Sequence, residues 1–135
     1  MLISPDIYKP FTLQVDACDS GAGGVLLQMT DEQTYHPVAY MSVKFKKHQK
    51  SYSTVEKELL AIVLALQKFE VYFTSHIPVH ILTDHNPLKF LQQAKLSNQR
   101  LLRWSLYLQQ FNMKVDFVKG SQNSIPDALS RVYSV

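Results

Sequence analysis

The sequence predicts an α/β domain built on a mixed five-stranded sheet flanked by helices. Three segments of strand character follow one another across short turns, and a long amphipathic helix then separates them from two further strands. Short turns produce an antiparallel meander, whereas a helical crossover lets the next strand run parallel to an earlier one. The predicted order, βββαβααβα, therefore favours a mixed sheet covered by helices.

The three opening strands follow from alternation and turn residues. Residues 11–16 alternate between apolar and polar side chains, which is typical of a strand. Residues 21–24, three of which are glycine, are expected to form a turn into a second strand at residues 25–28. Residues 35–43 predict a third strand, and Pro37 within it favours the edge of the sheet, where a missing N–H is tolerated.

The clearest element is a helix that follows Ser53. Ser53 and Glu56 have the spacing of a capping box, in which each satisfies a backbone N–H of the other. Behind them, apolar residues recur at alternating spacings of four and three, which predicts one buried stripe along about five helical turns. The stripe consists of Val55, Leu59, Ile62, Leu66, Phe69 and Phe73.

The later elements complete the sheet and its helical cover. Proline in the first turn marks the start of the last helix. The expected ranges are 77–83 and 113–118 for the fourth and fifth strands, 86–93 and 98–111 for two helices between them, and 124 onward for the last helix.

Length and composition fit one globular domain. The chain has 135 residues, 46% of them apolar, and its single cysteine, Cys18, excludes an internal disulfide framework. We therefore expect an intracellular protein, cytoplasmic or nuclear and not secreted. The longest apolar run, near residues 59–66, is too short to span a membrane, so no membrane partner is expected.

Positive charge is concentrated in one short segment. The formal net charge is only +3, but Lys44, Lys46, Lys47 and Lys50 fall within seven residues. Such clusters are often solvated surfaces, and they are also typical of surfaces that bind nucleic acid.

Four acids are candidates for a common site. The first and fourth strands end in Asp16 and Asp84, and adjacent strand ends in an open α/β sheet form a crevice where ligands usually bind. Glu58 borders the apolar stripe of the first helix, so its carboxylate can reach this rim, whereas Glu56 points to nearly the opposite side. Asp127 lies in the first turn of the last helix.

Each acid also has an ordinary structural interpretation. Asp16 and Asp84 could form a turn and a helix cap. Glu58 could be solvated, and Asp127 could complement the helix dipole. Carboxylates at neighbouring strand ends repel each other, however, unless a cation lies between them. Oxygen ligands without supporting His or Cys pairs favour Mg²⁺ or Mn²⁺ over structural zinc.

Several sequence blocks, in the same order, resemble the ribonuclease H domain of the reverse transcriptase of gypsy-type LTR retrotransposons (metaviruses). The match covers nearly the whole chain, although Cys18 replaces a more usual serine, Pro126 replaces a usual alanine, and the loop at residues 119–123 lacks the histidine of the cellular enzymes. The blocks are residues 5–11, 15–18, 23–28, 52–62, 83–88, 100–104 and 120–131.

This resemblance implies a ribonuclease H-like fold over residues 11–132, with residues 1–10 as a lead-in from the polymerase or connection part of the same polyprotein. It implies endonucleolytic hydrolysis of the RNA strand of RNA–DNA hybrids by two Mg²⁺ ions, with Mn²⁺ as a possible substitute. The catalytic, metal-binding acids implied are Asp16, Glu58, Asp84 and Asp127. The candidates for phosphate contacts, mainly with the DNA strand, are Lys44, Lys46, Lys47, Lys50, Arg100 and Arg103.

Two alternatives remain open at this point. The first is a catalytically silent module of the same fold, either structural or nucleic-acid-binding, although such modules usually lose acids that this chain keeps. The second is another nuclease of the superfamily, such as an integrase, whose acids have a different order and spacing.

Overall fold

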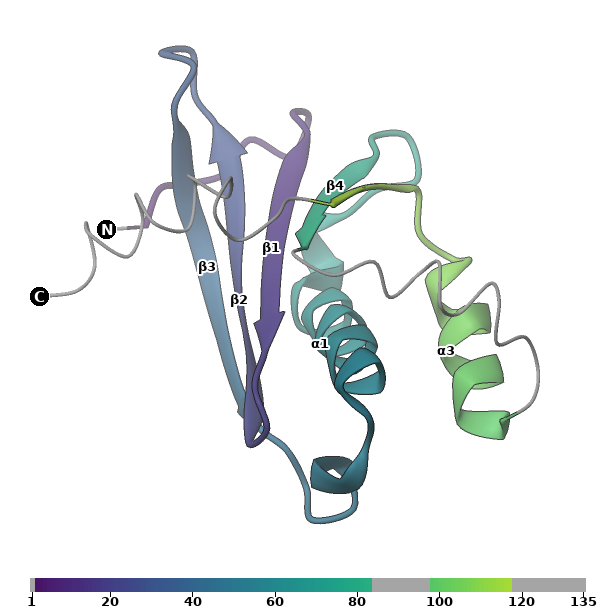
Figure 1. Ribbon diagram of the computed structural model, residues 1–135. Helices are drawn as coiled ribbons and strands as arrows, with labels where there is room; N and C mark the ends of the chain where they lie inside the picture. The colour runs from purple at the N-terminus through teal and green to yellow at the C-terminus, as the bar shows by residue number, and fades with distance from the viewer. Residues whose placement is uncertain (1, 84–97, 118–135) are drawn as a thin grey trace, which may run out of the picture.

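The computed structural model describes residues 2–83 and 98–117 (Figure 1). It confirms the predicted mixed sheet of five strands, in the order β3-β2-β1-β4-β5. The first three strands pair antiparallel, and β1, β4 and β5 pair parallel. The strands are β1 (Phe11–Ala17), β2 (Gly21–Met29), β3 (Tyr35–Lys44), β4 (Val79–Thr83) and β5 (Met113–Phe117). The predicted helices at 86–93 and from 124 onward lie outside the described residues.

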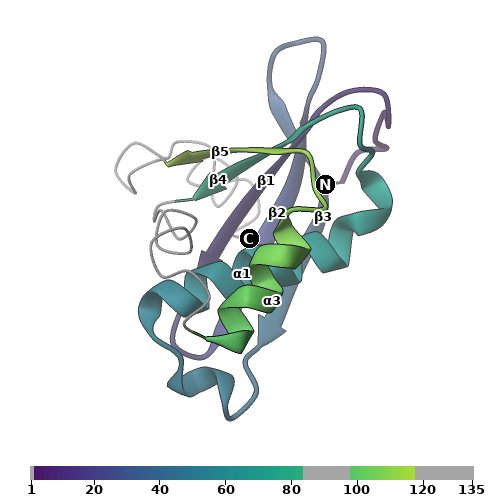
Figure 2. The ribbon, with the colours of Figure 1, turned by 90° about the vertical axis from the view of Figure 1, so that its right-hand side faces the viewer.

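Two helices pack on one side of the sheet. The helix α1 (Thr54–Phe69) lies against β1 and β2, and α3 (Gln99–Leu108) packs beside α1 (Figure 2). The core forms between α1 and the sheet, where Leu13, Leu59 and Ile81 are fully buried. In the described ranges, no helix is long and apolar enough to cross a lipid bilayer.

The start of α1 is held by the predicted capping box. The Ser53 hydroxyl accepts a hydrogen bond from the N–H of Glu56, and the Glu56 carboxylate accepts one from the N–H of Ser53, both at 3.2 Å. The α-helix ends at Phe69, and the short 3-10 helix η2 (Glu70–Tyr72) continues from it, so the predicted stripe outlasts the α-helix itself. A second 3-10 helix, η1 (Gln49–Ser51), precedes α1.

The glycines at 21–24 were expected to form a turn, and this expectation is wrong. They form the first half of β2, and the turn lies earlier, where the N–H of Cys18 donates to the carbonyl of Gly21 at 2.9 Å. The reason for glycine at 21 is close packing with the neighbouring strand. A Cβ there would lie 2.5 Å from the carbonyl oxygen of Val43.

The predicted edge position of the third strand is confirmed. β3 lies at the end of the sheet, and its register with β2 shifts so that Leu26 pairs with Ala39 and Leu27 pairs with Pro37. Val38 is therefore the extra residue of a β-bulge, a feature common on edge strands. The bulge accommodates the proline without breaking the longest pair of strands.

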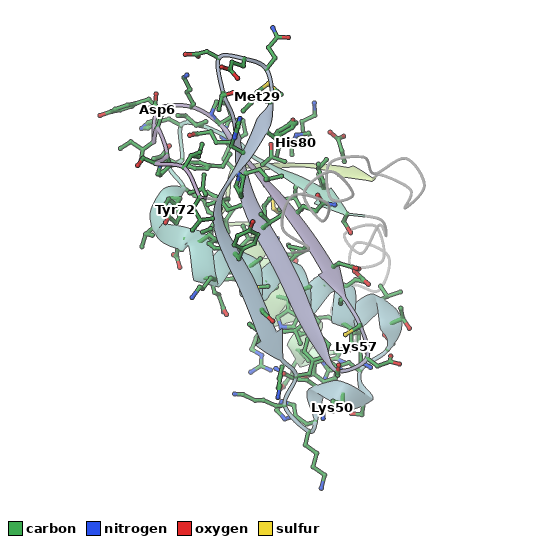
Figure 3. All side chains as sticks on the ribbon, turned by 90° about the vertical axis from the view of Figure 1, so that its left-hand side faces the viewer. Asp6, Met29, Lys50, Lys57, Tyr72 and His80 are labelled. Atoms are coloured by element: carbon green, nitrogen blue, oxygen red, sulfur yellow. The ribbon has the colours of Figure 1, made fainter. Side chains whose placement is uncertain are left out.

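The segment before β1 is tied to the sheet by Gln28, a buried residue of β2. The Gln28 side chain accepts a hydrogen bond from the N–H of Asp6 at 2.8 Å and donates to the carbonyls of Asp6 and Lys9 at 2.7 and 3.3 Å. Asp6 and Met29 lie at one end of the molecule, far from Lys50 and Lys57 (Figure 3). The boundaries predicted at residues 1–10 and 11–132 stay predictions.

The contrast between two glycines gives a test of this packing. Gly21→Ala should lower the free energy of unfolding by about 1–3 kcal/mol, because the new methyl group collides with backbone that cannot move freely. Gly23→Ala is the matched control, since the nearest atom to its Cβ would be 3.8 Å away. Its effect should stay within about 0.5 kcal/mol in urea unfolding. Equal destabilisation by both would show that the contact with the Val43 carbonyl is not the reason for glycine at residue 21.

Candidate functional site

Asp16 is the next-to-last residue of β1 and is exposed. Leu13 and Val15 belong to the core that packs against α1, so strand alternation turns Asp16 to the opposite face of the sheet, together with Gln14. The Asp16 carboxylate also accepts a hydrogen bond from the N–H of Ala17 at 2.9 Å. It therefore stands at the rim of the sheet, at the end where both β1 and β4 finish.

Glu58 reaches the same end of the molecule from within α1. The residue is only 3% exposed, and it lies one helical turn before Ile62, a fully buried residue of the core. The neighbouring Lys57 is buried as well, and its Nζ lies 3.4 Å from a carboxylate oxygen of Asp19, in the turn that follows β1. This contact brings the first turns of α1 beside the turn that follows Asp16.

The other two predicted acids, Asp84 and Asp127, lie outside the described residues. β4 ends at Thr83, which is buried, and Asp84 is the next residue of the chain. Within the part of the chain that the structure describes, no group of three or more His, Cys, Asp or Glu side chains is placed to hold a metal ion. Asp116, also on this part of the sheet, is hydrogen-bonded to His80 of β4.

The donor chemistry of the two described acids fits a hard cation. Both offer carboxylate oxygens, which Mg²⁺ prefers. Burial of a carboxylate in its ionised form is costly unless positive charge or hydrogen-bond donors compensate for it. A divalent ion at the strand ends would be such a charge.

An open groove lies beside Asp16, with a cavity volume of about 360 Å³. Gly23 pairs with both Asp16 and Ser42, so no side chain rises between them. The polar residues along the groove are Asp16, Cys18, Ser20, Ser42 and Lys44. Hydrogen bonds from Ser20, through its side chain and backbone, and from the backbone of Gly21 lower the pKa of the Cys18 thiol.

The predicted basic residues fall into two groups. Lys44, Lys46, Lys47 and Lys50 are all exposed, at the end of β3 and in the segment that leads through η1, at the end of the molecule that carries Asp16. Arg103 is exposed on α3, but Arg100 is partly buried. Its guanidinium forms an ion pair with Glu56 and lies 3.9 Å from the ring centroid of Tyr52.

Glu56 and Glu58 are separated as the helical geometry predicts. Burial alone would raise the pKa of Glu56, but hydrogen bonds from Arg100 and Ser53 outweigh it and hold this pKa below its ordinary value. Glu56 is therefore ionised in its capping role. Glu58 lies on the sheet-facing side of the same helix, two residues on.

Lys57 is the residue at this end that sequence reasoning missed. A lysine between two glutamates suggests a solvated helix start, yet its side chain is only 9% exposed. The signal was the unbroken apolar run that follows, because a helix apolar on nearly every side is buried on nearly every side. The structure bears this out, with every residue from Lys57 to Val63 buried.

The chain resembles a known family and several known proteins over most of its length. The family model described as "RNase H-like domain found in reverse transcriptase" matches residues 6–111. The Transposon Tf2-3 polyprotein of Schizosaccharomyces pombe is 42% identical over 140 residues, covering 97% of this chain and 10% of that protein. The chain thus spans about a tenth of the length of the curated relatives it matches.

The fold is similar to that of several solved structures. A foamy viral protease-reverse transcriptase in complex with dsDNA has a TM-score of 0.72 at 19% identity, covering 88% of this chain and 25% of that one. The foamy viral protease-reverse transcriptase in complex with an RNA/DNA hybrid has a TM-score of 0.68 at 19% identity, covering 88% of this chain and 16% of that one. RNase H1 of Halobacterium salinarum has a TM-score of 0.59 at 15% identity, covering 93% of this chain and 99% of that one. At these identities the likeness establishes a ribonuclease H fold.

The depressed pKa of Glu56 predicts an acid-sensitive part of the stability. The contribution of ionised Glu56 to the free energy of unfolding is complete above the ordinary glutamate pKa of about 4.5. It is lost as the pH falls through the lower pKa of Glu56 in the folded state. Glu56→Gln should therefore lower the free energy of unfolding by about 1 kcal/mol at neutral pH. The difference from wild type should shrink in urea titrations toward about pH 3.

Glu32→Gln serves as the control, because Glu32 is an exposed glutamate in the turn between β2 and β3. It should show no comparable pH-dependent difference. A constant difference between wild type and Glu56→Gln at every pH would contradict an ionic role for Glu56.

Proposed function

Because the chain belongs to the RNase H-like domains found in reverse transcriptases, we propose that it hydrolyses the RNA strand of RNA–DNA hybrids. The observation that carries this proposal is the pair of acids within the matched region: Asp16 at the rim of the parallel strand ends and Glu58 buried beneath the same end. The 42% sequence identity to a transposon polyprotein supports the proposal that the chain originates in a gypsy-type LTR retrotransposon, with a polymerase domain in the same polyprotein.

The strand register supports a shared position for a third acid. β1 and β4 pair in parallel with Thr12 beside His80 and Gln14 beside Leu82. Asp84 is the residue that follows Thr83, the last residue of β4, and is proposed as a ligand of the same site as Asp16. Carboxylates gathered in one site repel each other, which suits a site that binds cations.

In the proposed mechanism, Asp16, Glu58, Asp84 and Asp127 would hold two Mg²⁺ ions. When bound, the ions supply a stronger water nucleophile and neutralise the charge that develops on the leaving oxygen. Glu58 contributes a carboxylate whose burial fixes its orientation, and Asp16 contributes one open to the substrate. The exposed lysines at 44, 46, 47 and 50, together with Arg103, are proposed to contact phosphates, mainly of the DNA strand.

The test of the function is Mg²⁺-dependent cleavage of a hybrid with a labelled RNA strand, and the two glutamates supply matched variants. Glu58→Gln should reduce cleavage by at least about a hundredfold, because the neutral amide is a poor ligand for Mg²⁺. Glu56→Gln keeps a side chain able to cap the helix and is not a proposed metal ligand, so it should retain cleavage when the hybrid is at saturating concentration. Circular dichroism should show native folding in both.

The opposite pattern, with Glu56→Gln inactive and Glu58→Gln active, would contradict the assignment of the two helix faces. A wild-type chain that binds the hybrid without cleaving it would indicate the silent, nucleic-acid-binding module. Cleavage of DNA alone would indicate another nuclease of the superfamily.

Metal removal should separate activity from folding. EDTA should abolish cleavage, and added Mg²⁺ should restore it, while the cooperative thermal transition persists throughout. Asp84→Asn should likewise abolish cleavage at little cost to stability, or with a gain, because it relieves repulsion among clustered carboxylates. Loss of the cooperative transition in Asp84→Asn would show that this acid is structural.

A further inference from the structure

The four exposed lysines stand on an ordered segment, residues 44–50, which we term the lysine loop. It contains no acidic residue, so its positive charge is not neutralised from within. At its start Phe45 is buried, and the N–H of Phe45 donates to the carbonyl of Ser20 at 2.9 Å. One end of the loop is therefore fixed to the turn between β1 and β2, beside the groove.

Hydrogen bonds hold the shape of the loop itself. The N–H of Lys46 donates to the side chain of Gln49 at 2.8 Å, and the N–H of Gln49 donates to the carbonyl of Lys46 at 2.9 Å. The Ser51 hydroxyl donates to the carbonyl of His48 at 2.6 Å. Each lysine thus extends from a backbone whose conformation is set.

The far end of the lysine loop is fixed at Tyr52. The Arg100 guanidinium lies 3.9 Å from the centroid of the Tyr52 ring, and the ring of Trp104 lies 5.9 Å from it, edge to face. The ring of His48, within the loop, lies 6.1 Å from that of Tyr52. We call Tyr52, Glu56, Arg100 and Trp104 the Arg100 cluster.

Arg100 already has two partners within the protein. One side of its guanidinium plane faces Tyr52, its Nη2 is paired with Glu56, and its side chain is only 27% exposed. Arginine is suited to this double role, since its planar fork can stack and form an ion pair at once. The cluster joins α3, the start of α1 and the end of the lysine loop.

We propose that Arg100 is a positioning residue that holds the lysine loop in a fixed geometry to bind the phosphodiester backbone of the nucleic acid, and is not itself a phosphate ligand. The identity of that nucleic acid, an RNA–DNA hybrid, rests on the proposed function. A pre-arranged set of lysines loses less conformational freedom on binding than a mobile one, so its affinity depends on the cluster behind it.

The experiment measures hybrid binding by fluorescence anisotropy in EDTA, where no cleavage occurs, over a range of salt concentrations. Lys46→Gln/Lys47→Gln should lower the slope of log affinity against log salt by about 1 for each phosphate that the variant no longer neutralises. Arg100→Gln should weaken binding about threefold to tenfold. Arg100→Lys should weaken it similarly, because it keeps the charge but not the planar stack.

The decisive measurement is a double-mutant cycle. In the Lys46→Gln/Lys47→Gln background, Arg100→Gln should cost less affinity than it does in the wild-type background, because the loop that it positions has lost two of its four lysines. Arg103→Gln, an exposed arginine on the same helix, is the control and should have the same effect in both backgrounds. The proposal would be overturned if Arg100→Lys bound the hybrid with wild-type affinity. It would also be overturned if Arg100→Gln lowered the affinity by the same factor in both backgrounds.

Thermal unfolding would show whether Arg100→Gln is misfolded. A second variant therefore tests the proposal without changing Arg100. Tyr52→Leu removes the stacking partner and leaves the Arg100 charge in place. It should weaken binding if Arg100 positions the loop, and leave binding unchanged or tighter if Arg100 is a phosphate ligand.

Cleavage by the wild-type chain with Mg²⁺ is measured separately. If the effects of Arg100→Gln and Lys46→Gln/Lys47→Gln on binding are coupled but the wild-type chain does not cleave the hybrid, the proposed function alone is overturned. If the wild-type chain cleaves the hybrid but these two effects are additive, only the positioning role of Arg100 is overturned.

Discussion

The parallel pairing of β1 with β4 is the constraint on which the rest of the molecule depends. These are central strands, and Leu13 and Ile81, which pair across them, are both fully buried beneath α1. A parallel pair requires a crossover, and α1 supplies it while covering the sheet. Because parallel strands finish at the same edge, the pairing also decides where polar residues at the strand ends can meet.

That edge gathers charge from segments far apart in the sequence. Asp16 arrives on β1, the lysine loop follows β3, and Lys57 and Glu58 arrive on α1, whose first turns form the lower end of that helix in Figure 1. At the opposite end of the molecule, hydrogen bonds of the Gln28 side chain join β2 to the segment before β1. At the edge that carries Asp16, by contrast, a lysine and a glutamate are buried side by side. Such violations of local rules are typical of functional sites.

Three consecutive residues of α1 show how a helix divides these roles. Glu56 caps the helix and pairs with Arg100, Lys57 contacts Asp19, and Glu58 is buried toward the sheet. Each residue is rotated by about 100° from the one before, so neighbours in sequence meet different surroundings. The capping box fixes the helix at its first turn, and Glu58 follows within one further turn. A contact that stabilises the helix start therefore also fixes the direction of Glu58.

The sequence by itself determined the features that depend on neighbouring residues. The capping box, the opposite directions of Glu56 and Glu58, and the edge position indicated by Pro37 each follow from spacing along one segment, and the order of elements indicated the mixed sheet. Tertiary structure alone decided the rest. Glycine permits both a turn and a strand, so only the approach of the Val43 carbonyl shows why residue 21 is glycine. Arg100 and Glu56 are 44 residues apart, and no local pattern reveals that they meet. Local periodicity encodes which way a side chain points, whereas its partner is set by packing between distant segments.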